Sequence, residues 1–234
     1  MAAGMRSWVE FWDSEHAIYV NDRHKQLHAQ AVGRDLIRHI PFHDAIVLDH
    51  GCGEANYAAD VAQNCRWLYL CEAAPGVRAE LAYRVGRISN IEVLDPAGAE
   101  ALSDRSLDLV VANSLVQYLT RRELIDLLGL WRRKLKPTGV LVVADVIPPD
   151  VSPLRDAAAL LWFGLKGGFL LAAIGGLVRT ALSDYRKVRA QLGLATYSEP
   201  EFTAILADQG FIADRVRPNF GHNQGRMTFR AVRG

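Results

Sequence analysis

An acid and two closely spaced glycines follow the first strongly apolar segment of the chain, in the stretch IVLDHGCGEA at residues 46–55. Glycine has no Cβ atom, so Gly51 and Gly53 allow a sharp turn and let a ligand approach the backbone. Asp49 stands just before this turn, and a helix is predicted to begin at Glu54. A glycine turn between a strand and a helix N-terminus is typical of a site for a nucleotide-like ligand.

A second acid, Glu72, ends the next apolar segment, LYLCE, 19 residues after Gly53. If the two segments are neighbouring parallel strands, their carboxyl ends lie side by side. The Glu72 carboxylate can then accept hydrogen bonds from both hydroxyl groups of a ribose beside the glycine turn.

Two residues of the turn argue against a dinucleotide ligand. A dinucleotide-binding turn has a third glycine at position 56, where this chain has Asn56. Glu54 would repel a pyrophosphate, but it would not repel a ligand that carries positive charge. The pattern favours a positively charged adenosine ligand, with a dinucleotide-dependent oxidoreductase as the weaker alternative.

Short apolar segments alternate with helical segments through the first two thirds of the chain. Segments such as DLVVA and VLVVAD suit strands that are buried on both faces of a parallel sheet. The alternation predicts a Rossmann-like, doubly wound α/β fold in a single domain that spans residues 1–234. The expected strands are 46–49, 67–71, 91–94, 107–112 and 140–144, and the expected helices between them are 54–63, 75–85 and 121–135.

Helical regions precede and interrupt this pattern. Residues 1–43 are expected to form an N-terminal helical cap, with a helix over about 15–39, and residues 148–193 form an apolar helical insertion. The alternation then resumes with a helix at 199–208 and strands at 211–216 and 226–232. The connection between the last two strands is too short for a parallel crossover, so the last strand should be antiparallel.

The motifs, taken in order, resemble those of class I S-adenosylmethionine-dependent methyltransferases: IVLDHGCGEA, LYLCEAAP, SLDLVVANSLVQYL and GVLVVADVIPP. The resemblance covers about residues 44–148, and TYSEPEFTAILADQGF is similar to the helix before strand six in that family. It implies a seven-stranded sheet with strand seven antiparallel, and S-adenosyl-L-methionine as cofactor. It also implies cofactor-binding roles: Asp49, Gly51 and Gly53 around the methionine part, Glu72 on the ribose, Asp95 on the adenine, and Asn113 near the cofactor or substrate. The family often has a third glycine where this chain has Ala55.

Candidate catalytic groups lie after the strands. Methyl transfer needs a base only if the acceptor must lose a proton. His222 lies between the last two strands and Tyr118 follows strand four, so both are catalytic candidates. His222 as a turn residue and Tyr118 as the start of a helix are the alternatives. Tyr19, on the N-terminal helix, is expected to cover the cofactor.

The insertion contains a long apolar stretch. Residues 157–178 carry one charged residue, Lys166, in 22 positions, which is about the length of a membrane-spanning helix. The chain must return to the sheet afterwards, which opposes a single crossing. Three readings stay open: a pair of helices covering the substrate, bent at the Gly-Gly pairs; a homodimer interface; and a membrane-surface contact. The first and third favour an apolar or amphipathic small molecule as acceptor, such as a lipid-, quinone- or polyketide-like compound.

Composition limits the partners. There are 27 Lys and Arg residues and 26 Asp and Glu residues, a balance that argues against a nucleic-acid partner. Three cysteines with neither a paired spacing nor a zinc pattern argue against a metal site and favour a reducing compartment. The N-terminus does not resemble a secretory signal. We therefore expect a cytoplasmic enzyme, located at the inner face of a membrane if the insertion binds lipid. A non-catalytic cofactor-binding relative, using the insertion for partner or membrane contact, is the main alternative.

Overall fold

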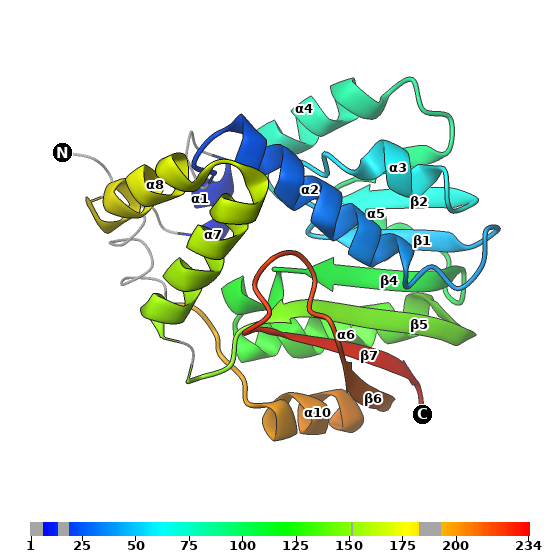
Figure 1. The fold of residues 1–234 in the computed structure, drawn as a ribbon. Coiled ribbons are helices and arrows are strands. Elements are labelled where there is room, and N and C mark those ends of the chain that lie inside the picture. Colours follow the sequence, from blue (N-terminus) through cyan, green and yellow to red (C-terminus); the bar gives the residue numbers. More distant parts are fainter. Residues whose placement is uncertain (1–6, 14–18, 151, 183–192) are drawn as a thin grey trace.

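A computed structural model describes residues 7–13, 19–150, 152–182 and 193–234 of the chain (Figure 1). Its centre is a seven-stranded sheet in the order β3-β2-β1-β4-β5-β7-β6. The strands are β1 (Ile46–His50), β2 (Trp67–Cys71), β3 (Ile91–Leu94), β4 (Leu107–Asn113), β5 (Leu135–Val146), β6 (Phe211–Val216) and β7 (Met227–Arg233).

The strand directions confirm the predicted sheet. Strands β1 to β5 pair in parallel, and β7 pairs antiparallel with both β5 and β6. β4 is buried along its first six residues, as its continuous apolar sequence predicts for a central strand. β5 is longer than expected, because residues from Leu135 onward already have extended backbone.

Helices cover both faces of the sheet and form two separate cores. On one face α2 (Asp22–Ile37), α3 (Ala58–Ala62) and α4 (Pro75–Val85) pack against the strands. On the other face lie α5 (Pro96–Ala101), α6 (Arg121–Lys134) and α10 (Glu199–Asp208), with Trp131 and Phe202 fully buried. The chain also forms a short helix, α1 (Trp8–Trp12), and a 3-10 turn, η1 (Val116–Tyr118).

The N-terminal helix and the first crossover helix differ from prediction. α2 begins at Asp22, where the Asn21 side chain accepts a hydrogen bond from His24 N, and part of the predicted helix (15–18) lies outside the described residues. The helix predicted at 54–63 is α3, which begins only at Ala58. α1 and α5 were not predicted, since five or six residues are too few to show a helical period.

The apolar insertion folds as two helices, α7 (Pro153–Gly167) and α8 (Leu170–Leu182), that pack on each other. The chain reverses at Gly168, whose φ of 75° is left-handed. The pair Gly175–Gly176, also predicted as a bend, instead lies inside α8. A Cβ on Gly176 would stand 2.1 Å from Val20 Cγ1, so glycine here allows close packing rather than a bend.

This α7–α8 hairpin lies beyond the carboxyl ends of the parallel strands, next to the start of α2 (Figure 1). Arg23 Nε donates to Gly167 O at 3.3 Å, and Arg179 Nη2 donates to Val20 O at 3.0 Å. In the described ranges, no helix combines the length and the apolarity that a membrane crossing requires. The insertion therefore adds a second helical layer at the edge where the candidate site residues gather.

Candidate functional site

The glycine loop joins β1 to α3 and is longer than the sequence suggests. Gly51, Gly53 and Ala55 have φ values of 78°, 58° and 41°. Residues with left-handed backbone at alternate positions cannot continue a helix, which explains why α3 starts after Tyr57 rather than at Glu54. Ala55 adopts a conformation that glycine tolerates better, at the position where the resembling family often has glycine.

Glu72 fastens the glycine loop to the end of β2. Its Oε2 accepts a hydrogen bond from Gly53 N at 2.9 Å, and its Oε1 accepts one from Ala74 N at 2.8 Å. A carboxylate oxygen can accept two hydrogen bonds, so each oxygen keeps acceptor capacity for a ligand hydroxyl. The predicted proximity of this carboxylate to the glycine loop is confirmed by the geometry.

Asp49 is a buried carboxyl beneath the same loop. Its Oδ2 accepts a hydrogen bond from Tyr57 Oη at 2.6 Å, while Oδ1 has no hydrogen-bond partner within the described part of the chain. Burial raises the pKa of Asp49 to about 7, the hydrogen bond from Tyr57 opposes this, and the nearby Glu72 charge adds to it. A carboxyl in this state would ionise readily when a cationic ligand group arrives. Nothing in the sequence pointed to Tyr57.

The loop leaves space for a ligand on one side only. A Cβ on Gly53 would meet no atom within 4 Å, whereas a Cβ on Gly51 would stand 2.9 Å from Leu115 Cδ1. Gly51 is therefore packed against the protein, and Gly53 borders open space. Open space, an unpartnered Asp49 oxygen and spare acceptor capacity on Glu72 together fit a ligand with a cationic group and a ribose.

Glu54 does not act as the sequence suggests. Its carboxylate forms an ion pair with Lys25 of α2 and accepts a hydrogen bond from Asn56 Nδ2. Burial opposes ionisation, yet these contacts hold the pKa of Glu54 below its ordinary value. Because Lys25 compensates its charge, repulsion by Glu54 is a weaker argument against a pyrophosphate than the sequence implied.

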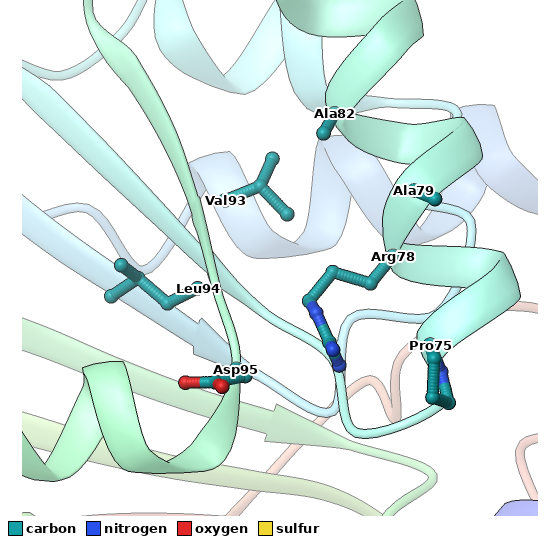
Figure 2. A pocket seen from close by; sticks show the side chains of 7 residues that line it. All are labelled: Pro75, Arg78, Ala79, Ala82, Val93, Leu94 and Asp95. Atoms are coloured by element: carbon teal, nitrogen blue, oxygen red, sulfur yellow. The ribbon is translucent and has the colours of Figure 1, made fainter.

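Asp95 follows β3, and Asn113 ends β4; β2 and β1 lie between these two strands in the sheet. Asp95 Oδ1 accepts a hydrogen bond from Gly98 N at 2.7 Å and caps α5. Between α4 and the end of β3 lies a hollow of about 470 Å³; Figure 2 shows the Arg78 side chain extending across it and the Asp95 carboxylate turned toward α5. Asn113 Oδ1 is buried and has no partner among the described residues, so it can accept a bond from a ligand.

Three histidines meet under the α7–α8 hairpin. His24 and His28 of α2 lie with ring centroids 5.9 and 5.7 Å from that of His222, in the loop between β6 and β7. Phe163 of α7 stacks on His222 at 4.6 Å, and Phe169, which follows the hairpin turn, stacks on His24 at 5.2 Å.

The three imidazoles are neutral near pH 7. Burial, and then repulsion by neighbouring histidines, lowers the pKa of His24 to about 4 and that of His222 to about 3. Burial also lowers the pKa of His28, partly opposed by Asp145. His24 Nε2, His28 Nδ1 and His222 Nδ1 are buried without a hydrogen-bond partner in the described ranges. Across those same ranges, no cluster of His, Cys, Asp and Glu is arranged to hold a metal ion.

Tyr19 lies at the edge of this histidine cluster, with its ring centroid 5.4 Å from that of His24 and 5.8 Å from that of His28. Burial, and then the Glu54 charge, raises the pKa of Tyr19 to about 12. Tyr118 belongs to a different aromatic cluster: its ring centroid lies 4.7 Å from that of Trp8 and 5.6 Å from that of Trp12, both on α1. The structure thus brings Tyr19 and His222 into one cluster and places Tyr118 against α1.

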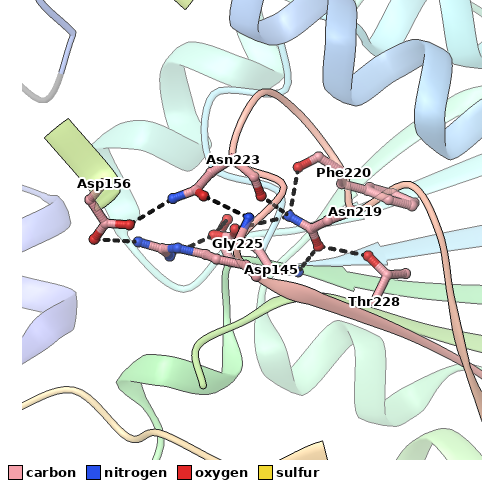
Figure 3. A network of polar contacts seen from close by, with 9 residues as sticks. Asp145, Asp156, Asn219, Phe220, Asn223, Gly225 and Thr228 are labelled. Atoms are coloured by element: carbon pink, nitrogen blue, oxygen red, sulfur yellow. Dashed lines mark hydrogen bonds and ion pairs between the residues drawn. The ribbon is translucent and has the colours of Figure 1, made fainter. Parts of the chain in front are cut away.

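A polar network holds the His222 loop to the end of β5 and to α7 (Figure 3). Arg226 pairs with Asp145 at 3.0 Å and with Asp156 at 3.5 Å, and Asn223 Nδ2 donates to Asp156 Oδ1 at 2.7 Å. Asn219 connects this loop to β7, because its Oδ1 accepts a hydrogen bond from Thr228 Oγ1 at 2.7 Å. The charges nearest the histidine cluster are therefore paired with one another.

Comparison with known proteins adds independent information. The family model described as "Methyltransferase domain" matches residues 48–143. No functionally curated protein matches the chain in sequence.

Several solved structures share the fold. Magnesium protoporphyrin IX methyltransferase from Synechocystis PCC 6803, with bound SAH, has 16% identity and a TM-score of 0.58, covering 97% of this chain and 93% of that one. The protein named DhpI, in complex with SAH, has 15% identity and a TM-score of 0.61, covering 97% and 95%. The protein in complex with the Haloferax volcanii Trm112 methyltransferase activator has 11% identity and a TM-score of 0.63, covering 98% and 99%.

At such identities the structural likeness establishes the fold, while the family match spans the glycine loop, Glu72 and the ends of β3 and β4. This match favours a methyltransferase over a dinucleotide-dependent oxidoreductase. An S-adenosylmethionine-dependent methyltransferase, with S-adenosyl-L-methionine as cofactor, is the activity that the match of residues 48–143 supports.

Proposed function

We propose that the enzyme methylates an apolar or amphipathic small molecule that is bound under the α7–α8 hairpin. The observation that carries this proposal is the inward position of Phe163 and Phe169 on the faces of His222 and His24. An acceptor at this place meets aromatic rings and neutral imidazoles, and the nearby charges of Asp145, Asp156 and Arg226 are already paired. Such surroundings favour an apolar body with few hydrogen-bonding groups.

The cofactor-binding roles follow from the loop geometry. Glu72 would accept hydrogen bonds from the ribose hydroxyls, because each of its oxygens keeps acceptor capacity. Asp49 would face the positively charged methionine part, and Gly53 would let that part lie against the backbone. Asn113 offers its unpartnered oxygen at the end of β4. For Asp95, we propose that its position at the β3 end borders the adenine, while its carboxylate caps α5.

S-adenosylmethionine, held by Glu72, Asp49 and Gly53, would supply the methyl group of its sulfonium to the acceptor atom and would become S-adenosylhomocysteine; a protic acceptor would also lose one proton. The protein's main tasks are to align the acceptor and to exclude water. With a pKa of about 3, His222 is a weak base, so we propose that it positions the acceptor through a hydrogen bond. Tyr19, which precedes α2, would close the same cluster, and Tyr118 would act from the α1 side.

The cofactor role of Glu72 is tested by isothermal titration calorimetry with S-adenosylhomocysteine. In Glu72→Gln one side-chain oxygen becomes an NH₂ group, which cannot accept from Gly53 or Ala74, and the charge is lost. We expect binding at least about tenfold weaker. Glu92→Gln, an exposed acid on β3, should bind like the wild type. Equal affinity in both variants would refute the role of Glu72.

The acceptor class is tested with two compounds that share one nucleophile, an alkylated hydroquinone and a sulfonated hydroquinone. We expect radiolabelled methyl groups from S-adenosylmethionine to reach the alkylated compound preferentially. Phe163→Ala should raise the KM for that compound while S-adenosylhomocysteine affinity stays unchanged. Preference for the sulfonated compound, with no effect of Phe163→Ala, would overturn the proposed acceptor class.

A further inference from the structure

The outer face of the α7–α8 hairpin is unusually apolar. Six of the ten exposed large hydrophobic residues in the described ranges lie on these two helices, so this is a concentrated patch rather than scattered exposure. We call this set the outer face; its members and exposed fractions are Leu154 (81%), Trp162 (59%), Leu165 (56%), Leu171 (85%), Ile174 (47%) and Val178 (56%).

The helical register explains how one hairpin has two apolar sides. Along α7, Leu154, Trp162 and Leu165 recur at spacings of eight and three residues, which keeps them on one stripe. Along α8, Leu171, Ile174 and Val178 recur at spacings of three and four. The opposite stripes carry the buried residues, among them Gly164, Ala173 and Gly176. The inner stripe thus packs against the protein, and the outer stripe is left to solvent.

The charges of the hairpin are divided between its two sides. Arg155 and Lys166 are exposed, and Lys166 Nζ lies 4.8 Å from the ring centroid of Trp162. Arg179 is also exposed, although its Nη2 donates to Val20 O. The acid of α7, Asp156, instead bonds Asn223 and pairs with Arg226 on the protein side (Figure 3). The outer face is therefore an apolar surface bordered by cations, with tryptophan beside a lysine. This combination fits an anionic bilayer surface.

The helices are too short to cross a bilayer. α7 has 15 residues and α8 has 13, which correspond to about 22 and 20 Å at about 1.5 Å per residue, against about 30 Å of hydrocarbon. Both ends of the insertion also return to the sheet. A hairpin of this length can lie in the interfacial plane with its apolar stripes toward the acyl chains.

Charge complementarity decides between a membrane and a second copy of the chain. If two copies joined through their outer faces by a two-fold axis, exposed cations of both helices would come together without an exposed acid of the hairpin's described residues to balance them. Anionic lipid headgroups supply the missing negative charge. We propose that the enzyme docks reversibly on anionic membranes through the outer face of α7–α8. This inference does not depend on which acceptor is methylated.

The experiment is flotation of the full-length protein with vesicles of phosphatidylcholine alone and of phosphatidylcholine mixed with phosphatidylglycerol. We expect the wild type to float with the mixed vesicles at low salt and less at high salt, because salt screens the headgroup attraction. Trp162→Asp should reduce the partition at least about tenfold, and so should Arg155→Glu combined with Lys166→Glu, two exposed cations of α7. Tyr83→Asp, at a 93% exposed site on α4, should float like the wild type.

Two further measurements separate loss of docking from other causes. Calorimetry with S-adenosylhomocysteine in solution should give wild-type affinity for Trp162→Asp, which separates loss of docking from loss of folding or of the cofactor site. Sedimentation velocity without lipid should show a monomer. The proposal is overturned if the wild type stays with the pellet at every lipid composition, or if it is a dimer that Trp162→Asp converts to a monomer.

Discussion

In the protein alone, burial and the Glu72 charge raise the pKa of Asp49 to about 7. A cationic ligand group beside this carboxyl would lower the pKa again, because it attracts the ionised form. Between its ordinary value of 3.8 and about 7, the folded protein binds a proton that the unfolded chain has released. The free energy of unfolding therefore falls as the pH rises through this window. A site that favours the cofactor thus weakens the unliganded fold at neutral and higher pH.

Replacing Asp49 with Asn should separate the two effects. Asn keeps an acceptor for Tyr57 but cannot ionise, so at about pH 8 we expect a higher melting temperature and cofactor affinity reduced at least about tenfold. Wild-type affinity should fall by up to about tenfold per pH unit below about pH 7, and the variant should lose this dependence. Calorimetry and thermal melting across that range measure both. Asp44→Asn, at an exposed position, should change neither property; a variant that melts lower and binds normally would contradict the argument.

Residue type and spacing were enough to indicate Asp49, Gly51, Gly53 and Glu72, because a glycine turn and a strand-end acid are local features. Tyr57 and His28 could not be found this way. Tyr57 reaches Asp49 only through the left-handed loop, and His28 meets His222 only because α2 crosses the edge of the sheet. The roles assigned to these side chains, and to Asp95 and Asn113, remain predictions.

At the scale of elements, several segments that a proline or glycine delimits were predicted to the residue. α4, β3, α10 and β6 have the expected bounds, since Pro75, Pro96, Pro200 and Gly210 mark their limits. Irregular backbone is harder to predict: residues 54–57 form a loop instead of the expected helix start, and Gly175–Gly176 lies inside α8 instead of at a bend. The second difference concerns glycine, whose role depends on whether it serves a turn or a close contact.

The two glycines of α8 offer a matched test of this distinction. In Gly176→Ala the new methyl group would meet Val20 at 2.1 Å, so we expect overpacking that costs about 1–3 kcal/mol. In Gly175→Ala the methyl group meets nothing within 4 Å, so higher helix propensity should stabilise the protein by up to about 1 kcal/mol. Urea unfolding gives both free energies, and hydrogen exchange shows whether α8 loosens. Shifts of the same sign in the two variants would mean that α8 does not pack on Val20 as described.

At the scale of the whole molecule, buried histidines make the fold sensitive to acid. The pKa values of His24, His28, His50 and His222 are lowered chiefly by burial, so below about pH 6.5 the unfolded chain binds more protons than the folded one. The free energy of unfolding then falls as the pH falls. The raised pKa of Asp49 has the opposite effect on the free energy of unfolding, but Asp49 is one group and these histidines are four.

We expect acid to act first at the α7–α8 hairpin, because three of these histidines lie beneath it. The hydrogen-exchange protection factors of α7 and α8 should fall on going from about pH 6.5 to about pH 5 before those of β4 and β5 do. His222→Gln should reduce the pH slope of stability by up to about 1.4 kcal/mol per pH unit, the share of one proton. His43→Gln, at an exposed position, serves as the control. A simultaneous fall of the protection factors in the hairpin and the central strands would show that the whole domain opens together.

The position of β7 has a consequence for how a nascent chain matures. Although β7 follows β6 in the sequence, it lies between β5 and β6 in the sheet. While the ribosome is still translating the last segment, β6 has no strand to join and the valine-rich edge of β5 stays open. The parallel half of the sheet can assemble during translation, but β6 is recruited only when residues 227–233 emerge. Until then the open edge of β5 is a natural point for chaperone capture or for misassembly between neighbouring nascent chains.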